Sequence, residues 1–183
     1  HKKEYEKSFP ASKSDELFIS NKYGGITITH WSKSEVAFRV VVEVKTRNAQ
    51  DDQKNLDRIQ IRLGKEGNVI SGITELSNVS VRNGKLDIQY YISMPSWVPC
   101  KLEQHYGNIQ MPSKNPAPCQ LTVKYGNIEG GSFEQPLQLE AKYSNVTLGA
   151  LQSADFDLGY CGKVILESAS QLNADSKYSN LKA

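Results

Sequence analysis

Four acidic side chains occupy the same position of a repeated phrase, and together they could do chemistry. Each stands three residues before a tyrosine: Glu103, Glu140, Asp157 and Asp175. Converging carboxylates would hold calcium, or would serve as acid and base in cleaving a polysaccharide. The register instead places these four in single file, and no arginine follows Arg82 to bind an acidic substrate. The pattern therefore favours a solvated face of alternating charge over a catalytic site.

Histidine and nucleophile chemistry has equally little support. His1, His30 and His105 are the only histidines, and none has a histidine, cysteine or carboxylate at the spacing of a metal site. No Ser–His–Asp constellation can be assembled, because His30 and His105 belong to unrelated phrases. We therefore predict no catalytic residue, no metal and no cofactor.

Two of the three cysteines are expected to be neighbours. Cys100 and Cys119 each lie six residues before a tyrosine of the repeat, so a parallel register places one above the other. Strands about 4.8 Å apart bring their Cα atoms within disulfide range, although parallel side chains make the dihedral angle awkward. A disulfide and a pair of free thiols both stay open, whereas Cys161 is expected to stay free.

Aromatic and asparagine side chains are the remaining candidates. The tyrosines share the parity of the apolar positions, so we expect them to face the core or line a corner, although an outward file would be a sugar-binding platform. Trp31 and Trp97 lie outside the repeats and are candidate ligand contacts, with packing under a loop as the alternative. The expected ladder comprises Tyr23, Tyr106, Tyr125, Tyr143, Tyr160 and Tyr178, with Asn108, Asn127, Asn145 and Asn180 hydrogen-bonded from copy to copy.

The elements that position these residues follow from the repeat itself. Tyr106-Gly107-Asn108-Ile109 returns, with variation, at intervals of 17 to 19 residues up to Tyr178. Apolar residues alternate on both sides of each copy, which is typical of two short strands meeting at a corner. Such a period predicts an all-β solenoid of about 18 residues per coil over residues 101–183.

The first half of the chain reads as a wider, more elaborate part of the same domain. Residues 1–16 are polar, so the first strand is expected near Leu17, and the phrase around Tyr23 is expected to be a first, separated coil. Further strands are predicted over 36–45, 56–63, 68–76 and 86–94, with a short helix over 48–55. The interpretation is one domain, 1–183, divided into an elaborated part, 1–100, and regular coils, 101–183.

The composition and charge of the chain argue against two kinds of partner, nucleic acid and the membrane interior. A net charge of +2 gives no reason to expect nucleic acid, and no apolar run approaches the length that spans a membrane.

Three phrases resemble a family of bacterial cell-surface proteins, the adhesin-like proteins of Bacteroides-type bacteria: Ile19 to Ile26, Tyr90 to Pro95, and the Tyr-Gly-Asn-Ile copies. The resemblance implies a right-handed parallel β-helix (β-solenoid), export to the cell surface, outer membrane or periplasm, and a binding or adhesion role without catalysis. The expected partner is an extracellular glycan or protein, and the oligomeric state stays open. The alternatives are a carbohydrate-active enzyme of β-helix type and a scaffold that stacks through its terminal coil.

Overall fold

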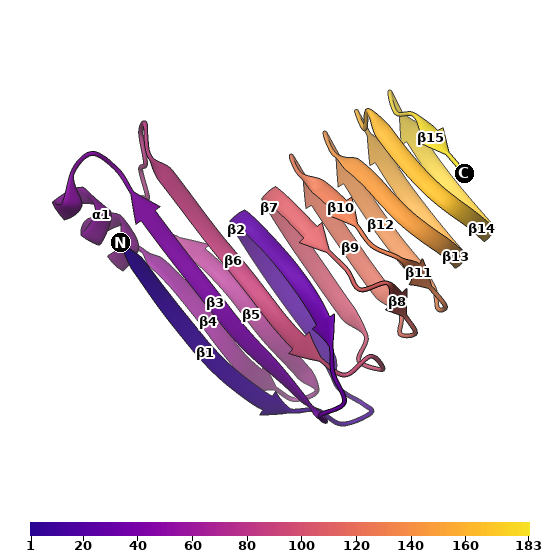
Figure 1. The fold of residues 1–183 in the computed structure, drawn as a ribbon, viewed down its shortest axis with the longest axis horizontal. Helices are drawn as coiled ribbons and strands as arrows, with labels where there is room; N and C mark the ends of the chain where they lie inside the picture. Colours follow the sequence, from indigo (N-terminus) through magenta and orange to yellow (C-terminus); the bar gives the residue numbers. More distant parts are fainter.

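The computed structural model describes residues 1–183, which form fifteen strands and one helix (Figure 1). The helix α1 spans Ala49–Asp57. The strands are β1 Lys2–Pro10, β2 Glu16–His30, β3 Glu35–Lys45, β4 Ile59–Glu66, β5 Val69–Leu76, β6 Lys85–Met94, β7 Cys100–Gln110, β8 Lys114–Asn115, β9 Cys119–Lys124, β10 Asn127–Glu129, β11 Ser132–Phe133, β12 Leu137–Lys142, β13 Asn145–Gly159, β14 Lys163–Lys177 and β15 Leu181–Lys182.

All strands belong to one hydrogen-bonded sheet of mixed direction, with β1 near one end and β15 near the other (Figure 1). The order in the first half is β1-β3-β6-β2-β7, so β2 lies between β6 and β7. β1, β3 and β6 pair antiparallel, as do β4 and β5. From β2 onward toward the C-terminal end the pairs are parallel. Strands β7, β9, β12, β13 and β10 pair in a closed path of five parallel strands, and the others extend this sheet outward.

The predicted right-handed parallel β-helix is therefore wrong. The first half contributes long antiparallel strands, and the second half closes a barrel-like ring of five parallel strands through β10, which pairs with both β7 and β13. The reason is that the repeat period of the sequence specifies only part of the fold. Regular spacing determines which residues face one another across parallel strands, but it determines neither the handedness of the path nor the way in which the sheet closes.

The first strand is also misplaced in the sequence interpretation. β1 begins at Lys2 and pairs along its whole length with β3. Its side chains are mostly charged and exposed, and only Tyr5 and Phe9 are half-buried toward the core. Phe9 packs edge-on against Phe38, with ring centres 5.9 Å apart. The polar composition gave no sign of this strand, because an edge strand needs few apolar residues. Charged side chains on such a strand also prevent it from pairing with another chain.

The other elements of the first half confirm the prediction. The helix α1 forms with Asn48 as its N-cap, whose side chain accepts a hydrogen bond from the backbone N–H of Gln50. The hairpin β4–β5 and the strands β3 and β6 lie within a few residues of the predicted ranges. A continuous core of 38 buried apolar residues runs from Leu17 to Leu166 and connects both halves.

One buried polar cluster interrupts this core. Asn21 donates hydrogen bonds to the carbonyl of Ile88 and to the side chain of Gln104, at 2.8 and 2.9 Å. Thr74 donates to the Asn21 oxygen at 2.8 Å and also contacts the hydroxyl of Tyr90. The cluster satisfies its own hydrogen bonds, so it fixes where β2 meets its neighbours rather than offering a free polar group to a ligand.

Candidate functional site

Six tyrosines adopt a backbone conformation that is rare for a residue with a side chain. Their φ angles lie between 51° and 59°, in the left-handed region, and they account for six of the eight such non-glycine residues. A single left-handed residue shifts the in-and-out alternation of a strand by one position. Around Tyr125, Val123 and Ile128 are buried, whereas the tyrosine itself points outward.

The tyrosine rings consequently stack on the surface. Consecutive rings lie 4.9 to 5.1 Å apart between centres and within 15° of parallel, from Tyr23 through Tyr178. Their exposed fractions run from 38% at Tyr23 to 80% at Tyr178. The expectation that the tyrosines face the core is therefore wrong, since parity assumed regular strand geometry through the corner. The six rings form an exposed aromatic row about 25 Å long.

Two polar rows flank the aromatic row. The residue before each tyrosine supplies a largely basic row and the residue two after it supplies an asparagine row, which is exposed at all four asparagines. The backbone N–H of Asn127 donates to the Asn108 side chain at 2.9 Å, and that of Asn145 donates to Asn127 at 3.3 Å. We call these three rows the tyrosine face: the six tyrosines, then Lys22, His105, Lys124, Lys142 and Lys177, and Asn108, Asn127, Asn145 and Asn180.

The acidic residues border the basic row on its far side. Their strands pair so that Glu140 lies opposite both Thr122 and Asp157, in single file as predicted. Lys142 lies 2.9 Å from Asp157, and this hydrogen bond raises the pKa of Lys142. Lys124 lies 4.0 Å from Glu140. These exposed pairs partly neutralise two lysines, whereas Lys22 and Lys177 make no ion pair.

The one histidine on the tyrosine face is held neutral by its surroundings. His105 lies between Lys22 and Lys124 in the parallel register. Burial, followed by the charges of Lys124 and Lys22, lowers the pKa of His105. At neutral pH the basic row therefore contributes lysine charge and a neutral imidazole, which can both donate and accept a hydrogen bond.

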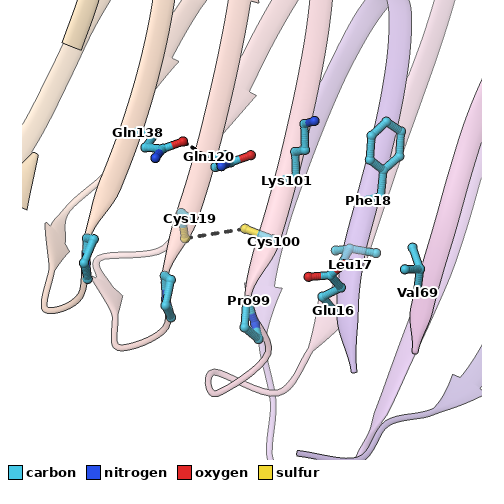
Figure 2. Close-up of a pocket in the computed structure, with 12 residues that line it drawn as sticks. Glu16, Leu17, Phe18, Val69, Pro99, Cys100, Lys101, Cys119, Gln120 and Gln138 are labelled. Atoms are coloured by element: carbon cyan, nitrogen blue, oxygen red, sulfur yellow. Dashed lines mark hydrogen bonds between the residues drawn. The ribbon is translucent and has the colours of Figure 1, made fainter. Parts of the chain in front are cut away.

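A groove of about 490 Å³ opens where β2, β7, β9 and β12 begin (Figure 2). Three prolines line it at successive copies, each directly before one of the strands β7, β9 and β12: Pro99, Pro118 and Pro136. Gln120 donates a hydrogen bond to Gln138 across its upper part at 2.6 Å. The groove is open and shallow, and Figure 2 shows Cys100 and Cys119 facing one another in its wall.

The cysteines are neighbours in the predicted register. Cys100 pairs directly with Cys119, and their sulfur atoms lie 3.5 Å apart as two buried free thiols. The mutual hydrogen bond, with burial next, raises the pKa of Cys100 well above its usual value. Cys161 is a third, separate buried thiol whose sulfur lies 3.2 Å from the carbonyl of Ala141.

The structure places the two tryptophans apart from the tyrosine face. Trp31 follows β2, is half-buried, and donates its indole N–H to the carbonyl of Glu35 at 2.8 Å. Trp97 lies in the loop between β6 and β7 and is 40% exposed. Trp97 is therefore the tryptophan with surface to offer a ligand, whereas much of Trp31 is committed to packing.

Reasoning from sequence missed the outward turn of the tyrosines. A signal was present, because glycine or asparagine follows each of the six tyrosines within two residues and marks a bend that needs positive φ. The structure places that conformation at the tyrosine itself and not at the residues that follow it. No helix in the structure has the length and hydropathy needed to cross a membrane.

No protein-family model matches the sequence, and no curated protein matches it either. Among solved structures, the chain is similar to a "putative cell adhesion protein" from Clostridium sporogenes, with a TM-score of 0.50 and 9% identity over 97% of this chain and 100% of that one. It is also similar to a "putative adhesin" from Bacteroides fragilis (TM-score 0.40, 11% identity, 96% and 97% covered). A third is a "putative lipid binding protein" from Parabacteroides distasonis (TM-score 0.46, 11% identity, 98% and 73% covered). At these identities the likeness to the Clostridium protein concerns the fold alone.

Proposed function

We propose that this chain is an exported, non-catalytic binding protein, and that the tyrosine face binds its ligand. The observation that carries the proposal is the row of six exposed, stacked tyrosines. Exposed aromatic side chains in a contiguous row are unusual on a protein that has no partner for them. Tyrosine combines apolar area with a hydroxyl group and is enriched where proteins bind other molecules.

The geometry of the row favours an extended ligand. Because the rings stack face to face, their flat faces are covered by neighbours, and what they present to solvent is edges and hydroxyl groups at intervals of about 5 Å. Amide groups lie on one side of these hydroxyls and lysines on the other. A chain-like ligand rich in hydroxyl groups, such as a glycan, would meet the same set of donors and acceptors at every step along the row.

The arrangement of charge supports a role in binding rather than in chemistry. Glu140 and Asp157 lie on the outer face of the sheet and each contacts a lysine. A catalytic pair of carboxylates works in a site that holds the substrate between them and limits water. A broad self-similar face instead spreads its contacts over many equivalent residues.

The fold gives further support. The similar Clostridium and Bacteroides structures carry names that refer to adhesion, which agrees with a ligand outside the cell and with export of this chain. The partner we propose is an extracellular glycan, with an extracellular protein as the alternative.

The test is a screen of the purified chain on glycan and extracellular-matrix arrays, followed by affinity measurements on variants. The double change Tyr125→Ala with Tyr143→Ala should weaken binding of a hit by about tenfold or more, which corresponds to about 1.4 kcal/mol. Tyr91→Ala is the matched control, because Tyr91 is a 41% exposed tyrosine outside the tyrosine face. That variant should bind within a few-fold of the unmodified protein.

Three outcomes would contradict the proposal. Binding that survives the double tyrosine change but is lost in Trp97→Ala would move the site to the loop before β7. Equal loss in Tyr91→Ala and in the double variant would show that the effect is not specific to the tyrosine face. Depolymerisation of a bound polysaccharide, abolished by Glu140→Gln, would make the chain an enzyme.

A further inference from the structure

The paired cysteines line two separate cavities. One is the groove of Figure 2, and the other is a much smaller cavity of about 10 Å³. That volume is about the size of one water molecule or one small ion. Both residues line the surface groove although they are almost fully buried, at 6% and 5% exposed.

The sulfur separation fits chelation of one ion. Two sulfur atoms bound to one metal ion at bonds of about 2.3 Å lie about 3.8 Å apart at a tetrahedral angle and about 4.0 Å apart at the trigonal angle of a three-ligand site. The Cys100 and Cys119 sulfur atoms lie 3.5 Å apart. Each atom would have to move by about 0.15 to 0.25 Å to bind an ion jointly, whereas a disulfide at about 2.05 Å requires a much larger approach.

The smaller cavity contains further groups that could bind a soft ion. Two thioethers, those of Met94 and Met111, line it, together with His30 and the side chain of Asn115. Asn115 is 2% exposed, and its Nδ2 donates to the carbonyls of Pro112 and Ser132. Its Oδ1 atom is buried and has no hydrogen-bond partner. A buried acceptor without a partner, in the lining of this mostly apolar cavity, is an independent indication that a small polar group occupies the cavity.

The set of groups restricts the kind of ion. His30 shares the cavity lining with the two cysteines, but no three histidine, cysteine, aspartate or glutamate side chains are placed so that they could hold a metal ion together. Zinc and the harder divalent cations draw their ligands from those residue types, so two cysteines alone would leave them incompletely bound. Thiolate and thioether together are the ligands that favour monovalent copper.

We propose that Cys100 and Cys119, with Met111 or Met94 as a third partner, bind one soft monovalent cation of the Cu⁺ class. Each cysteine that binds loses its thiol proton to solvent as its sulfur–metal bond forms, so no electron is transferred. The ion reaches the pair from the groove that the three prolines line. Oxidation of the pair to a disulfide would remove the site, so the metal-bound and disulfide forms exclude one another.

The experiment uses Ag⁺ as the probe, because it resembles Cu⁺ in its preference for sulfur. The full chain, reduced and kept free of oxygen, is titrated with Ag⁺ in the presence of a competing thioether chelator, and native mass spectrometry counts the bound ions. We expect one Ag⁺ per chain, together with a rise in the unfolding temperature. Met111→Leu and Met94→Leu conserve volume, and one of them should weaken binding by about tenfold or more, as expected when a partner of a metal site is removed.

The control is Cys161→Ser, which removes a buried thiol that has no neighbouring cysteine and should leave the bound Ag⁺ in place. The double change Cys100→Ala with Cys119→Ala should abolish binding. If that variant does not fold, the methionine variants and the wild-type count decide alone. The proposal would be overturned if the reduced wild-type chain bound no Ag⁺. It would also be overturned if Cys161→Ser abolished Ag⁺ binding, or if neither methionine change weakened it.

Discussion

Replacing one tyrosine of the stacked row by glycine should harm the protein less than replacing it by alanine. Tyr125 has a φ of 58° and its ring stacks on Tyr106 and Tyr143, at 5.1 and 4.9 Å between centres. Both changes remove the ring and its two stacking contacts. Only glycine also relieves the left-handed backbone, which any residue with a Cβ atom adopts at a cost.

The magnitudes can be worked from these contacts. Each aromatic pair stabilises by about 0.5–1.5 kcal/mol, so losing two costs roughly 1–3 kcal/mol in either variant. Relief of the left-handed conformation stabilises the folded Tyr125→Gly variant by about 1–2 kcal/mol relative to Tyr125→Ala. The greater conformational freedom of glycine in the unfolded chain opposes this by about 0.5–1 kcal/mol. We expect Tyr125→Gly to be more stable than Tyr125→Ala by roughly 0.5–1 kcal/mol.

The assay is equilibrium unfolding in urea, comparing midpoints at an unchanged slope. Tyr91 on β6 is the control: it is exposed, lies in ordinary extended backbone, and has no stacked tyrosine neighbour. There glycine should be worse than alanine by about 0.5–1 kcal/mol, because a strand interior disfavours glycine. The order of the two substitutions should thus reverse between the two sites.

A Tyr125→Gly variant that is equal to or less stable than Tyr125→Ala would refute the reasoning. It would mean that the left-handed conformation carries no cost in this setting, or that the corner rearranges once the ring is gone. The same order at both positions would likewise show that general glycine flexibility, and not the conformation at Tyr125, decides the effect.

Two further predictions concern stability. Gly131→Ala should lower the free energy of unfolding by about 1–3 kcal/mol or more, because the added Cβ would lie 2.0 Å from the carbonyl oxygen of Ser113. Gly64→Ala is the control: its Cβ would meet no atom within 4 Å, so this change should be neutral or slightly stabilising. Thermal unfolding compares the two variants. A hydrogen bond from Lys65 lowers the pKa of Asp15, so its stabilisation is present above about pH 4 and is lost as the pH falls through the lowered pKa. Asp15→Asn should weaken the fold at pH 7 and flatten the acid side of its stability curve; an unchanged acid limb would contradict this.

Much of the pairing follows from the sequence. Because parallel strands repeat the same offset, a spacing of 19 residues is enough to place Cys100 opposite Cys119. The hairpin β4–β5 and the helix α1 carry local signals, a polar turn and an asparagine cap, that need no tertiary information. β1 carries no such signal, and only its pairing with β3 makes it a strand.

The small cavity beside Cys100 and Cys119 could not be predicted from the spacing of the repeat. His30, Met94, Met111 and Asn115 belong to separate strands or loops and share no repeat position with the cysteines. Their approach depends on how β2, β6, β7 and β8 are arranged around the cavity. The residue type alone does not predict that a methionine or an asparagine will line a particular cavity.

The sequence by itself determined the period, the alternation and hence which side chains follow one another along the rows. Only the tertiary structure decided which way the tyrosines point and how the strands close. The bend needs one left-handed residue, and glycine, asparagine or tyrosine could each take that conformation at energies within about 1–2 kcal/mol of one another. Stacking of Tyr125 on its neighbours and the pairing of β10 with both β7 and β13 exist only after distant segments meet. These contacts are absent from any single copy of the repeat, and they decide which residue at the bend adopts the left-handed conformation.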